Sequence, residues 1–333
     1  MRALRLSKKK GLYLSDTNIP RLSSDEVLIQ VKYVGICGSD IKIIRGEMGY
    51  LDDIILGHEF GGTIVAIGKG VMKWKKGDRV VADPTITCGK CTFCLSNQHN
   101  LCLNLDGKNG GELGVNLNGA FADYVKIKQE NIYRLPSEVS FQEATLVEPL
   151  ACILNGFNRL HIQEGASAGI IGLGPIGLLW SELFRLGKVS VCGTDLSDTR
   201  TKIANSLGVK KLNPSYQDDL DYVVDTTGSC FSLACNLVRP GGKVVVFGMS
   251  PKASEQINPF LIAKKNMTIY GVNMDSRTFP QAISLIKKIR SDKIITNKFK
   301  LEEYAAAFAA CGLNTLSRKS CAQKSMKVLL CLG

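Results

Sequence analysis

Three side chains in the first part of the chain have the types that hold a catalytic zinc ion. Cys37 lies in Gly-Ile-Cys-Gly-Ser-Asp, and His58 and Glu59 lie in Gly-His-Glu-Phe-Gly-Gly. A thiolate, an imidazole and a carboxylate leave one of the four zinc positions for water, which is typical of catalytic rather than structural sites. The spacing therefore predicts a zinc ion that acts on a small molecule.

Two polar residues beside Cys37 have predicted roles in the same site. Asp40 could accept the second ring N–H of His58 and fix its tautomer. Ser39, two residues after Cys37, could carry a proton away from an alcohol bound at the zinc. Taken singly, Cys37 is better explained as a buried cysteine, His58 as a core histidine and Asp40 as the cap of a turn. Taken together, they favour a metal site.

Another carboxylate, Glu148, stands in the apolar stretch Ala-Thr-Leu-Val-Glu-Pro-Leu-Ala. A carboxylate in apolar surroundings is costly unless it is paired or bound to a metal. An N-cap or a surface glutamate ahead of a helix explains Glu148 equally well. From the residues alone, both interpretations remain open.

Four cysteines form a second cluster, in Cys-Gly-Lys-Cys-Thr-Phe-Cys and, after seven further residues, a last cysteine. Four thiolates at this spacing can complete a tetrahedral zinc site that has no open position. The sequence thus predicts a structural zinc lobe at about residues 88–102, with the ligands Cys88, Cys91, Cys94 and Cys102. We expect no disulfides, because clustered cysteines in a reducing compartment favour metals.

A glycine-rich turn between a short strand and a helix predicts a dinucleotide site. Residues 168–177 read Ala-Gly-Ile-Ile-Gly-Leu-Gly-Pro-Ile-Gly. A turn of this form places a pyrophosphate on the N-terminus of the helix that follows. The cofactor residues predicted here are Gly172, Gly174, Pro175, Ile176 and Gly177.

An acidic residue after the next predicted strand favours NAD as the cofactor. Asp195 lies 18 residues after Gly177 (195 minus 177), the spacing at which a carboxylate holds a ribose hydroxyl. The same carboxylate would repel the extra phosphate of NADP. Arg200 lies nearby and keeps NADP as the less favoured alternative.

Three further residues lie at the C-terminal ends of predicted strands of the same region: Thr226, Gly248 and Gly271. Open α/β sheets bind their ligands at the carboxyl ends of the strands. These residues are therefore candidates for lining the nicotinamide site. The alternative is that each is simply a turn residue.

Two kinds of domain are needed to position these side chains. Up to about residue 150, short β-branched runs broken by glycines predict a mostly-β domain that carries the zinc motif in its loops, with strands at 27–34, 62–67, 78–82 and 119–125. Further along, apolar strands alternate with helices, which predicts an α/β domain with a parallel sheet. The helical runs 279–289 and 302–310 and a last strand at 327–331 are expected to pack on the first domain.

The composition and the charge limit the kinds of binding partner that are expected. Lys+Arg 42 against Asp+Glu 30 gives a net charge of +12, which attracts anions. No basic stripe carries interleaved aromatic residues, so nucleic acid is not expected. No apolar run has the roughly eighteen residues of a membrane span, and no apolar block follows the basic N-terminus as in a secretory signal. We expect a cytoplasmic protein with a small-molecule substrate.

With both cysteine motifs and the glycine turn in hand, the chain resembles the zinc-dependent medium-chain alcohol and polyol dehydrogenases over nearly its whole length. The sorbitol dehydrogenase branch is the most similar, through Gly-His-Glu-Phe, Val-Glu-Pro-Leu, Gly-Leu-Gly-Pro-Ile-Gly and Thr-Asp-Leu-Ser. The resemblance implies a GroES-like catalytic domain at residues 1–150 and 285–333 and a Rossmann domain with a doubly wound parallel sheet at residues 151–284. It also implies homodimers or homotetramers.

Carried over by position, the resemblance implies that Cys37 and His58 bind the catalytic zinc and that Asp40 is the partner of the histidine. Glu59 would be a direct or an intermittent ligand. Glu148 stands where alcohol dehydrogenases have a second cysteine ligand, and in the polyol branch a glutamate there lies beside the zinc and its water. Which glutamate completes the site stays open.

Two departures from the family are visible. Lys42 stands where a histidine of the proton relay or substrate pocket is usual, so it could bind an anionic group or reroute the proton. The stretch between Val209 and Asp221 is shorter than is usual in the family, which predicts the loss of a helix there.

The predicted function is the oxidation of a secondary alcohol of a polyol or sugar derivative, free or phosphorylated, with two zinc ions per chain and NAD. Lys42 and the net charge slightly favour a phosphorylated substrate. The alternatives are a dehydrogenase of a simple alcohol or amino-alcohol, and a non-catalytic family member that binds a nucleotide. A nucleic-acid-binding zinc module is a further rival.

Overall fold

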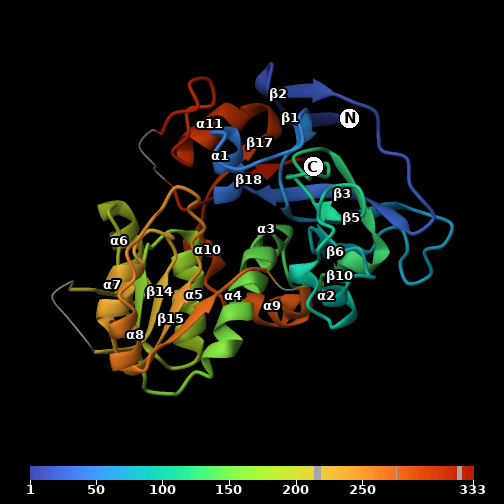
Figure 1. Ribbon diagram of the computed structural model, residues 1–333. Coiled ribbons are helices and arrows are strands. Elements are labelled where there is room, and N and C mark those ends of the chain that lie inside the picture. Colours follow the sequence, from blue (N-terminus) through green and yellow to red (C-terminus); the bar gives the residue numbers. More distant parts are fainter. Residues whose placement is uncertain (214–218, 275, 321–324) are drawn as a thin grey trace. The chain divides into compact units, whose positions relative to one another are not determined.

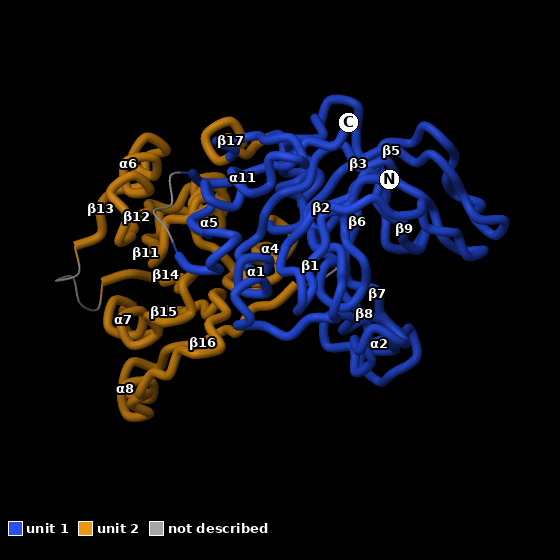
Figure 2. The backbone as a smooth tube through the Cα atoms, turned by 90° about the horizontal axis from the view of Figure 1, so that it is seen from above, with its two compact units in different colours: residues 1–149, 275–287, 295–333 blue, residues 150–274, 288–294 orange. Residues whose placement is uncertain are grey.

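The computed structural model in Figure 1 describes residues 1–213, 219–274, 276–320 and 325–333. The chain forms two compact units (Figure 2). The first unit contains residues 1–149, 275–287 and 295–333, and the second contains residues 150–274 and 288–294. Within the described residues, no helix is both long and apolar enough to cross a membrane.

The first unit is built around a seven-stranded sheet with the strand order β10-β6-β5-β3-β18-β17, in which β9 also pairs with β3. A three-stranded sheet, β2-β1-β4, and a two-stranded one, β7-β8, accompany it. The strands are β1 Arg2–Ser7, β2 Gly11–Asp16, β3 Glu26–Gly35, β4 Ile54–Ile55, β5 Glu59–Ile67, β6 Arg79–Ala82, β7 Thr85–Ile86, β8 Gly111–Glu112, β9 Tyr124–Lys128, β10 Ile132–Arg134, β17 Ile295–Lys300 and β18 Lys327–Cys331.

The C-terminal strand completes this sheet. β18 lies antiparallel to β3 and parallel to β17, so the last residues of the chain join its first strands, as the sequence predicts. Phe60, Phe121 and Phe308 are almost fully buried in the core between the sheets. The helices of this unit are α1 Gly38–Ile44, α2 Thr92–Leu95, α3 Phe141–Ala144, α9 Phe279–Leu285 and α11 Tyr304–Ala310, with single 3-10 turns at 99–101, 129–131, 276–278 and 301–303.

The second unit contains six parallel strands in the order β13-β12-β11-β14-β15-β16. Numbered along the chain, this is the order 3-2-1-4-5-6 of dinucleotide-binding sheets, whose strand order reverses between β11 and β14. The central strands are buried on both faces and are accordingly rich in valine and isoleucine. The strands are β11 Ser167–Ile171, β12 Ser190–Thr194, β13 Lys210–Lys211, β14 Leu220–Asp225, β15 Val238–Val246 and β16 Thr268–Gly271.

Helices cover both faces of the parallel sheet. Figure 1 shows β14 and β15 between α7 on one side and α4 and α5 on the other. The α4 and α5 helices pack through aromatic rings, since Phe157 contacts both Trp180 and Phe184. The helices are α4 Val147–Leu160, α5 Pro175–Leu186, α6 Asp198–Ser206, α7 Phe231–Leu237, α8 Pro259–Lys265 and α10 Ser291–Ile294.

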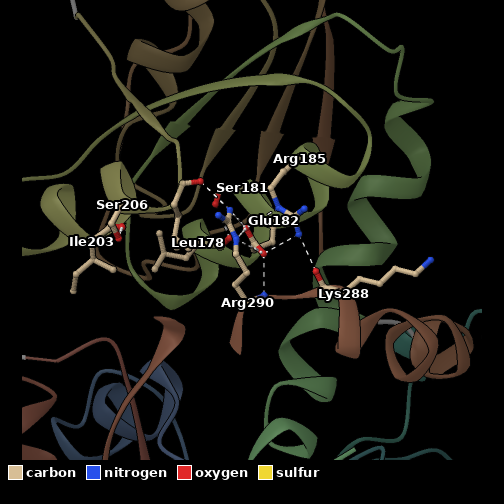
Figure 3. Close-up of polar contacts among 9 residues, drawn as sticks. Leu178, Ser181, Glu182, Arg185, Ile203, Ser206, Lys288 and Arg290 are labelled. Carbon is tan, nitrogen blue, oxygen red and sulfur yellow. Dashed lines mark hydrogen bonds and ion pairs between the residues drawn. The ribbon is translucent and has the colours of Figure 1, made fainter. Parts of the chain in front are cut away.

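A buried glutamate attaches the short segment 288–294 to the second unit (Figure 3). Glu182 on α5 is fully buried. Its carboxylate accepts hydrogen bonds from Nε of Arg290 at 3.0 Å and from the backbone N–H of Arg290 at 2.9 Å. Arg185 donates to the same carboxylate at 3.1 Å and to the carbonyl of Lys288 at 2.8 Å. These contacts hold the segment against α5.

This architecture confirms the predicted fold class, a mostly-β domain together with a doubly wound parallel sheet. One predicted strand is wrong in part, because the run 119–125 is a strand only from Tyr124 onward. Its first residues instead donate backbone hydrogen bonds to the loop at residues 55–57. The predicted loss of a helix before Asp221 falls mainly on residues 214–218, which lie outside the described residues.

Candidate active site

The predicted zinc ligands of the first unit come together from two loops. Cys37 lies between the end of β3 and the start of α1, and His58 directly precedes β5, which begins at Glu59. The ligand atoms of Cys37, His58 and Glu59 all lie within 4.8 Å of one another. Since His58 and Glu59 are buried, the three donors converge on one protected point.

The loop before His58 is fixed by the segment 119–121. Gly57 has a φ of 91°, and a Cβ atom there would lie 2.4 Å from the ring of Phe121. The backbone N–H groups of Ala120 and Phe121 donate to the carbonyls of Gly57 and Leu56 at 2.8 and 2.9 Å. A glycine is therefore required before the histidine, and the Gly-His pair is held in one conformation.

Asp40 and Ser39 flank the imidazole of His58. One oxygen of Asp40 accepts the backbone N–H of Cys37 at 2.8 Å, and the other lies 3.9 Å from Nδ1 of His58. Oγ of Ser39 lies 3.5 Å from Nε2 of the same ring. The carboxylate thus lies on the Nδ1 side of the ring, beyond hydrogen-bond distance, and the hydroxyl lies on the Nε2 side.

The charges of the site suit a cation. Burial would lower the pKa of His58, but the Asp40 carboxylate and the Cys37 thiol outweigh it, so this pKa is raised well above its usual value. Within the described part of the chain, the buried atoms Nδ1 of His58, Oδ1 of Asp40 and Oε1 of Glu59 have no hydrogen-bond partner. A thiolate, an imidazole and a carboxylate with such unsatisfied atoms fit a zinc ion.

Lys327 is a residue of this site that the sequence did not reveal. Its ammonium group forms a buried ion pair with Oε2 of Glu59 and donates to the carbonyl of Ile36 at 3.1 Å. Burial would lower the pKa of Lys327, but Glu59 outweighs this effect and the pKa is raised. The one available signal was a lysine that opens an otherwise apolar strand.

Glu148 lies near the set without belonging to it, and Lys42 lies on the helix that follows Cys37. Glu148 is buried in the first turn of α4, and its charge raises the pKa of His58. It is not part of the group whose ligand atoms lie within 4.8 Å of one another. Lys42 lies in the last turn of α1, three residues after Ser39, and residues at that spacing are neighbours on one side of a helix.

The four cysteines of the second cluster also come together. The Sγ–Sγ distances are 3.5 Å for Cys91 and Cys94, 3.9 Å for Cys88 and Cys94, and 4.0 Å for Cys91 and Cys102. A tetrahedron with Zn–S bonds of about 2.3 Å requires about 3.8 Å between sulfurs. The backbone N–H of Lys90 and the side-chain amide of Asn104 lower the pKa of Cys88 to about 6. The four sulfurs therefore fit a structural zinc.

The glycine turn of the second unit is tightly built. Gly172 has a φ of 91°, and a Cβ atom there would lie 2.5 Å from the hydroxyl of Thr226. A Cβ atom at Gly177 would lie 2.1 Å from the carbonyl of Gly172. Gly174 is the N-cap of α5, whose first two residues are Pro175 and Ile176. The turn leaves the N-terminus of a twelve-residue helix available for an anion.

Asp195 and Arg200 lie directly beside this turn. The carboxylate of Asp195 accepts the backbone N–H groups of Leu173 and Ser197, both at 2.8 Å, and the guanidinium of Arg200 at 3.3 Å. The guanidinium carbon of Arg200 would lie 3.9 Å from a Cβ atom at Gly174. The two candidate determinants of cofactor choice are thus paired with each other.

The strand ends are arranged differently from one another. The hydroxyl of Thr226 donates to the carbonyls of Ile171 and Gly172 at 3.0 and 2.8 Å, which joins the end of β14 to the glycine turn. Gly248 packs against the turn that follows Thr226. Gly271 ends the edge strand β16, two strands away from β14, and its carbonyl accepts a hydrogen bond from Arg159.

Asp225 supports the Thr226 turn and was not singled out by the sequence. It is fully buried at the end of β14. Its carboxylate accepts the backbone N–H groups of Thr227, Gly228 and Cys230 at 2.8, 3.1 and 3.0 Å. A turn of this kind at the point where the strand order reverses is where open α/β sheets hold ligands.

Two protein-family models match the chain. Residues 23–137 match the alcohol dehydrogenase GroES-like domain, and residues 175–288 match the zinc-binding dehydrogenase domain. The chain is 31% identical over 327 residues to a sorbitol dehydrogenase of Bacillus subtilis, covering 91% of both proteins. It is 32% identical over 316 residues to a D-arabitol-phosphate dehydrogenase of Enterococcus avium, covering 88% of both.

Solved structures are similar over the whole chain. A zinc-binding dehydrogenase of Sinorhizobium meliloti 1021 bound to NADP has a TM-score of 0.89 at 27% identity, covering 99% of this chain and 98% of its own. An alcohol dehydrogenase of Escherichia coli CFT073 complexed with NADH has a TM-score of 0.88 at 29% identity, covering 99% of both chains.

Proposed function

The chain belongs to the zinc-binding alcohol dehydrogenase family, and on this basis we propose that it oxidises a secondary alcohol of a polyol or sugar derivative with NAD. The observation that carries the proposal is the convergence of Cys37, His58 and Glu59 within 4.8 Å. A family member that had lost catalysis would have no need to keep a thiolate, an imidazole and a carboxylate at one buried point.

In the proposed site Cys37 and His58 hold the catalytic zinc, and Glu59 or Glu148 completes the protein ligands. A zinc ion bound there would polarise the alcohol oxygen and lower its pKa. Asp40, through Nδ1, orients the imidazole of His58. Ser39 receives the alcohol proton and passes it towards solvent. NAD held at the glycine turn would supply the hydride acceptor, and the products would be a ketone, NADH and one proton.

The proposed cofactor is NAD. Asp195 supports this choice, because its carboxylate would meet the ribose hydroxyls and repel a 2′-phosphate. Arg200 works in the opposite direction, since a guanidinium can pair with a phosphate. The relatives include one structure bound to NADP and one complexed with NADH, so the balance between these two side chains determines the preference. The second zinc is proposed for the four-cysteine lobe.

The proposed substrate class rests on the relatives and on Lys42. Sorbitol dehydrogenase and D-arabitol-phosphate dehydrogenase are among them, which supports a polyol, free or phosphorylated. Lys42 lies one turn after Ser39 on α1, and together with the net charge of +12 it favours the phosphorylated form. A simple alcohol or an amino-alcohol is the second candidate.

We further propose a cytoplasmic homodimer or homotetramer. The eleven cysteines in the described part of the chain are thiols rather than halves of disulfides, which supports a reducing compartment. In the described sheets, β16 pairs with β15 on one side and leaves its other edge open. An open edge strand is suited to pairing with a second copy.

The test is NADH formation across matched pairs of free and phosphorylated polyols, with and without a zinc chelator. Activity that is lost with the chelator and greater on one member of a pair would support the proposal and identify the substrate class. If protein that holds two zinc ions per chain forms no NADH with any polyol tested, the proposed polyol substrate is wrong.

A further inference from the structure

A basic groove lies in the first unit, apart from the residues assigned to zinc and cofactor. It has a volume of about 420 Å³ and runs between the turn that joins β1 to β2 and the helix α11 (labelled in Figure 1). None of the candidate zinc or cofactor residues lines it. The lining residues are Lys9, Lys10, Gly11, Leu12, Tyr304, Ala305, Ala309, Asn314, Thr315, Leu316 and Arg318.

The floor of the groove is apolar and is formed partly by small side chains. Ala305 and Ala309 lie four residues apart on α11, so they share one face of the helix and leave space above it. Leu12 and the ring of Tyr304 continue this surface. Such a floor suits the carbon skeleton of a small molecule, and the volume falls in the range of small-molecule sites.

The rim of the groove carries three cations and no carboxylate: Lys9, Lys10 and Arg318. Lys10 lies over the ring of Tyr13 at 4.8 Å, and its charge also acts on Asp53, which lies outside the groove lining. Arg318 is only partly exposed and forms no ion pair with any residue that the structure describes. Like charges gathered at one place repel one another, and an anion would remove that cost.

The backbone also presents Arg318 to the groove. Its φ of 55° lies in the left-handed region, which a residue with a side chain seldom adopts and which often marks a functional site. A Cβ atom at Gly11 would lie 3.4 Å from a terminal nitrogen of this guanidinium. The guanidinium therefore lies against the turn between β1 and β2, at the glycine that follows Lys10.

Neutral donors complete the rim. Oδ1 of Asn314 accepts the backbone N–H groups of Leu316 and Ser317 at 3.1 and 2.9 Å, which leaves its amide nitrogen as a donor. Thr315 adds a hydroxyl. A planar guanidinium, an ammonium group, an amide and a hydroxyl match the several oxygens of a phosphate better than the two of a carboxylate.

We propose that this groove binds the phosphate monoester of a small metabolite, with Arg318 and Lys10 on the phosphate and α11 beneath the remainder. This site is distinct from the dehydrogenase site, and its existence does not depend on the proposed function. A phosphorylated polyol substrate would be bound elsewhere, near Lys42.

The experiment is isothermal titration of the zinc-loaded chain with D-ribose 5-phosphate, with D-ribose as the uncharged match and inorganic phosphate as the free anion. Lys10→Gln/Arg318→Gln removes two cations that line the groove. Lys8→Gln/Lys319→Gln removes two exposed cations from the same turn and loop that do not line it, so it matches the change in net charge.

We expect the groove variant to bind ribose 5-phosphate about a hundredfold more weakly, because two charge-assisted hydrogen bonds are lost. The matched variant should bind within about twofold of the unchanged chain. Polyol oxidation should be unaffected in both variants, and D-ribose should not bind.

Several results would overturn the proposal. Equal binding by the groove variant, or loss of binding only in Lys42→Gln, would place the phosphate outside the groove. Inorganic phosphate binding as tightly as the ester would reject the role of the α11 floor. Co-sedimentation with phosphatidic acid vesicles that only the groove variant abolishes would assign the phosphate to a lipid surface instead.

Discussion

Two glutamates are candidates for the third protein ligand of the proposed catalytic zinc. Glu59 has its carboxylate among the ligand atoms, but one of its oxygens is held by Lys327. Glu148 is buried nearby and acts on His58 through its charge. The two can be separated by substitution, because glutamine keeps the shape of each side chain and removes the negative charge that favours a cation.

We expect Glu59→Gln to lose the catalytic zinc at a chelator concentration about tenfold lower than the unchanged chain does, since a charged ligand is removed. Glu148→Gln should keep two zinc ions per chain under the same conditions. Zinc is measured by atomic emission after dialysis. The double variant Glu59→Gln/Lys327→Met controls for the buried lysine that the single change leaves unpaired. Zinc loss in Glu148→Gln alone would make Glu148 the ligand.

The proposed determinants of cofactor preference are also single residues. Asp195→Ser removes the carboxylate that repels a 2′-phosphate and frees Arg200, which lies 3.3 Å away, to pair with that phosphate. We expect the ratio of kcat/KM for NAD to that for NADP to fall by about tenfold or more, the scale of one charge-assisted contact. Asp198→Ser, an exposed acid three residues further on, should leave the ratio unchanged. An unaltered ratio in Asp195→Ser would show that Asp195 does not contact the ribose of the cofactor.

At the residue scale, the sequence can predict donors that lie in local motifs but not partners that the fold supplies. Cys37, Ser39 and Asp40 are neighbours in the chain, so their shared site could be inferred from residue types. Lys327 is 268 residues away from Glu59, and only the position of β18 beside β3 brings the two together. The assigned roles of the site residues remain predictions until they are tested by substitution.

Among the elements, the attachment of segment 288–294 to α5 makes a prediction about stability. Burial would raise the pKa of Glu182, but hydrogen bonds from Arg290 and Arg185 outweigh it, so this pKa is lowered. The ionised carboxylate therefore stabilises the folded chain. Glu182→Gln should lower the free energy of unfolding by about 2–3 kcal/mol at neutral pH, since the bonds to charged partners are weakened.

The pH dependence has a defined sign. Because the pKa of Glu182 is lower in the folded chain, its contribution is complete above the unfolded value of about 4.3 and is lost as the pH falls through the folded value. The difference between Glu182→Gln and the unchanged chain in urea unfolding should therefore shrink below about pH 4. Glu164→Gln, which breaks an exposed pair with Lys188, should have little effect. A constant difference down to pH 3 would contradict the role of the charge.

Strands with a clear hydrophobic pattern could be predicted from the sequence. Segments whose conformation is fixed by tertiary contacts could not. The central strands of the second unit contain continuous apolar runs. The ends of β14, β15 and β16 fall within two residues of Thr226, Gly248 and Gly271, which were expected at strand ends. Residues 119–123 have the composition of a strand, but they bond to the loop before His58 instead. Composition cannot distinguish a strand from a segment that packs its backbone against a neighbouring turn.

For the whole molecule, the open edges of the two larger sheets indicate where a second copy would pair. In the described chain these edges are β9, β10 and β17 in the first unit and β13 and β16 in the second. Four of them carry cationic side chains, namely Lys126 with Lys128, Arg134, Lys298 with Lys300, and Lys210 with Lys211. Charges on an edge strand prevent pairing with another strand. β16 reads Thr-Ile-Tyr-Gly and has none.

We therefore expect Thr268→Lys to halve the number of chains in the assembly. Two copies paired at β16 would bring the added charges together across their symmetry axis, and the charges would repel one another. Light scattering after gel filtration gives the mass. Asn297→Lys adds the same charge to β17, which already carries lysines, and should leave the mass unchanged. If Thr268→Lys keeps its mass, β16 is not the interface. If the unchanged chain is itself a monomer of 36.2 kDa, the proposed pairing at β16 is wrong. The four-residue length of β16 would then be the feature that prevents edge pairing.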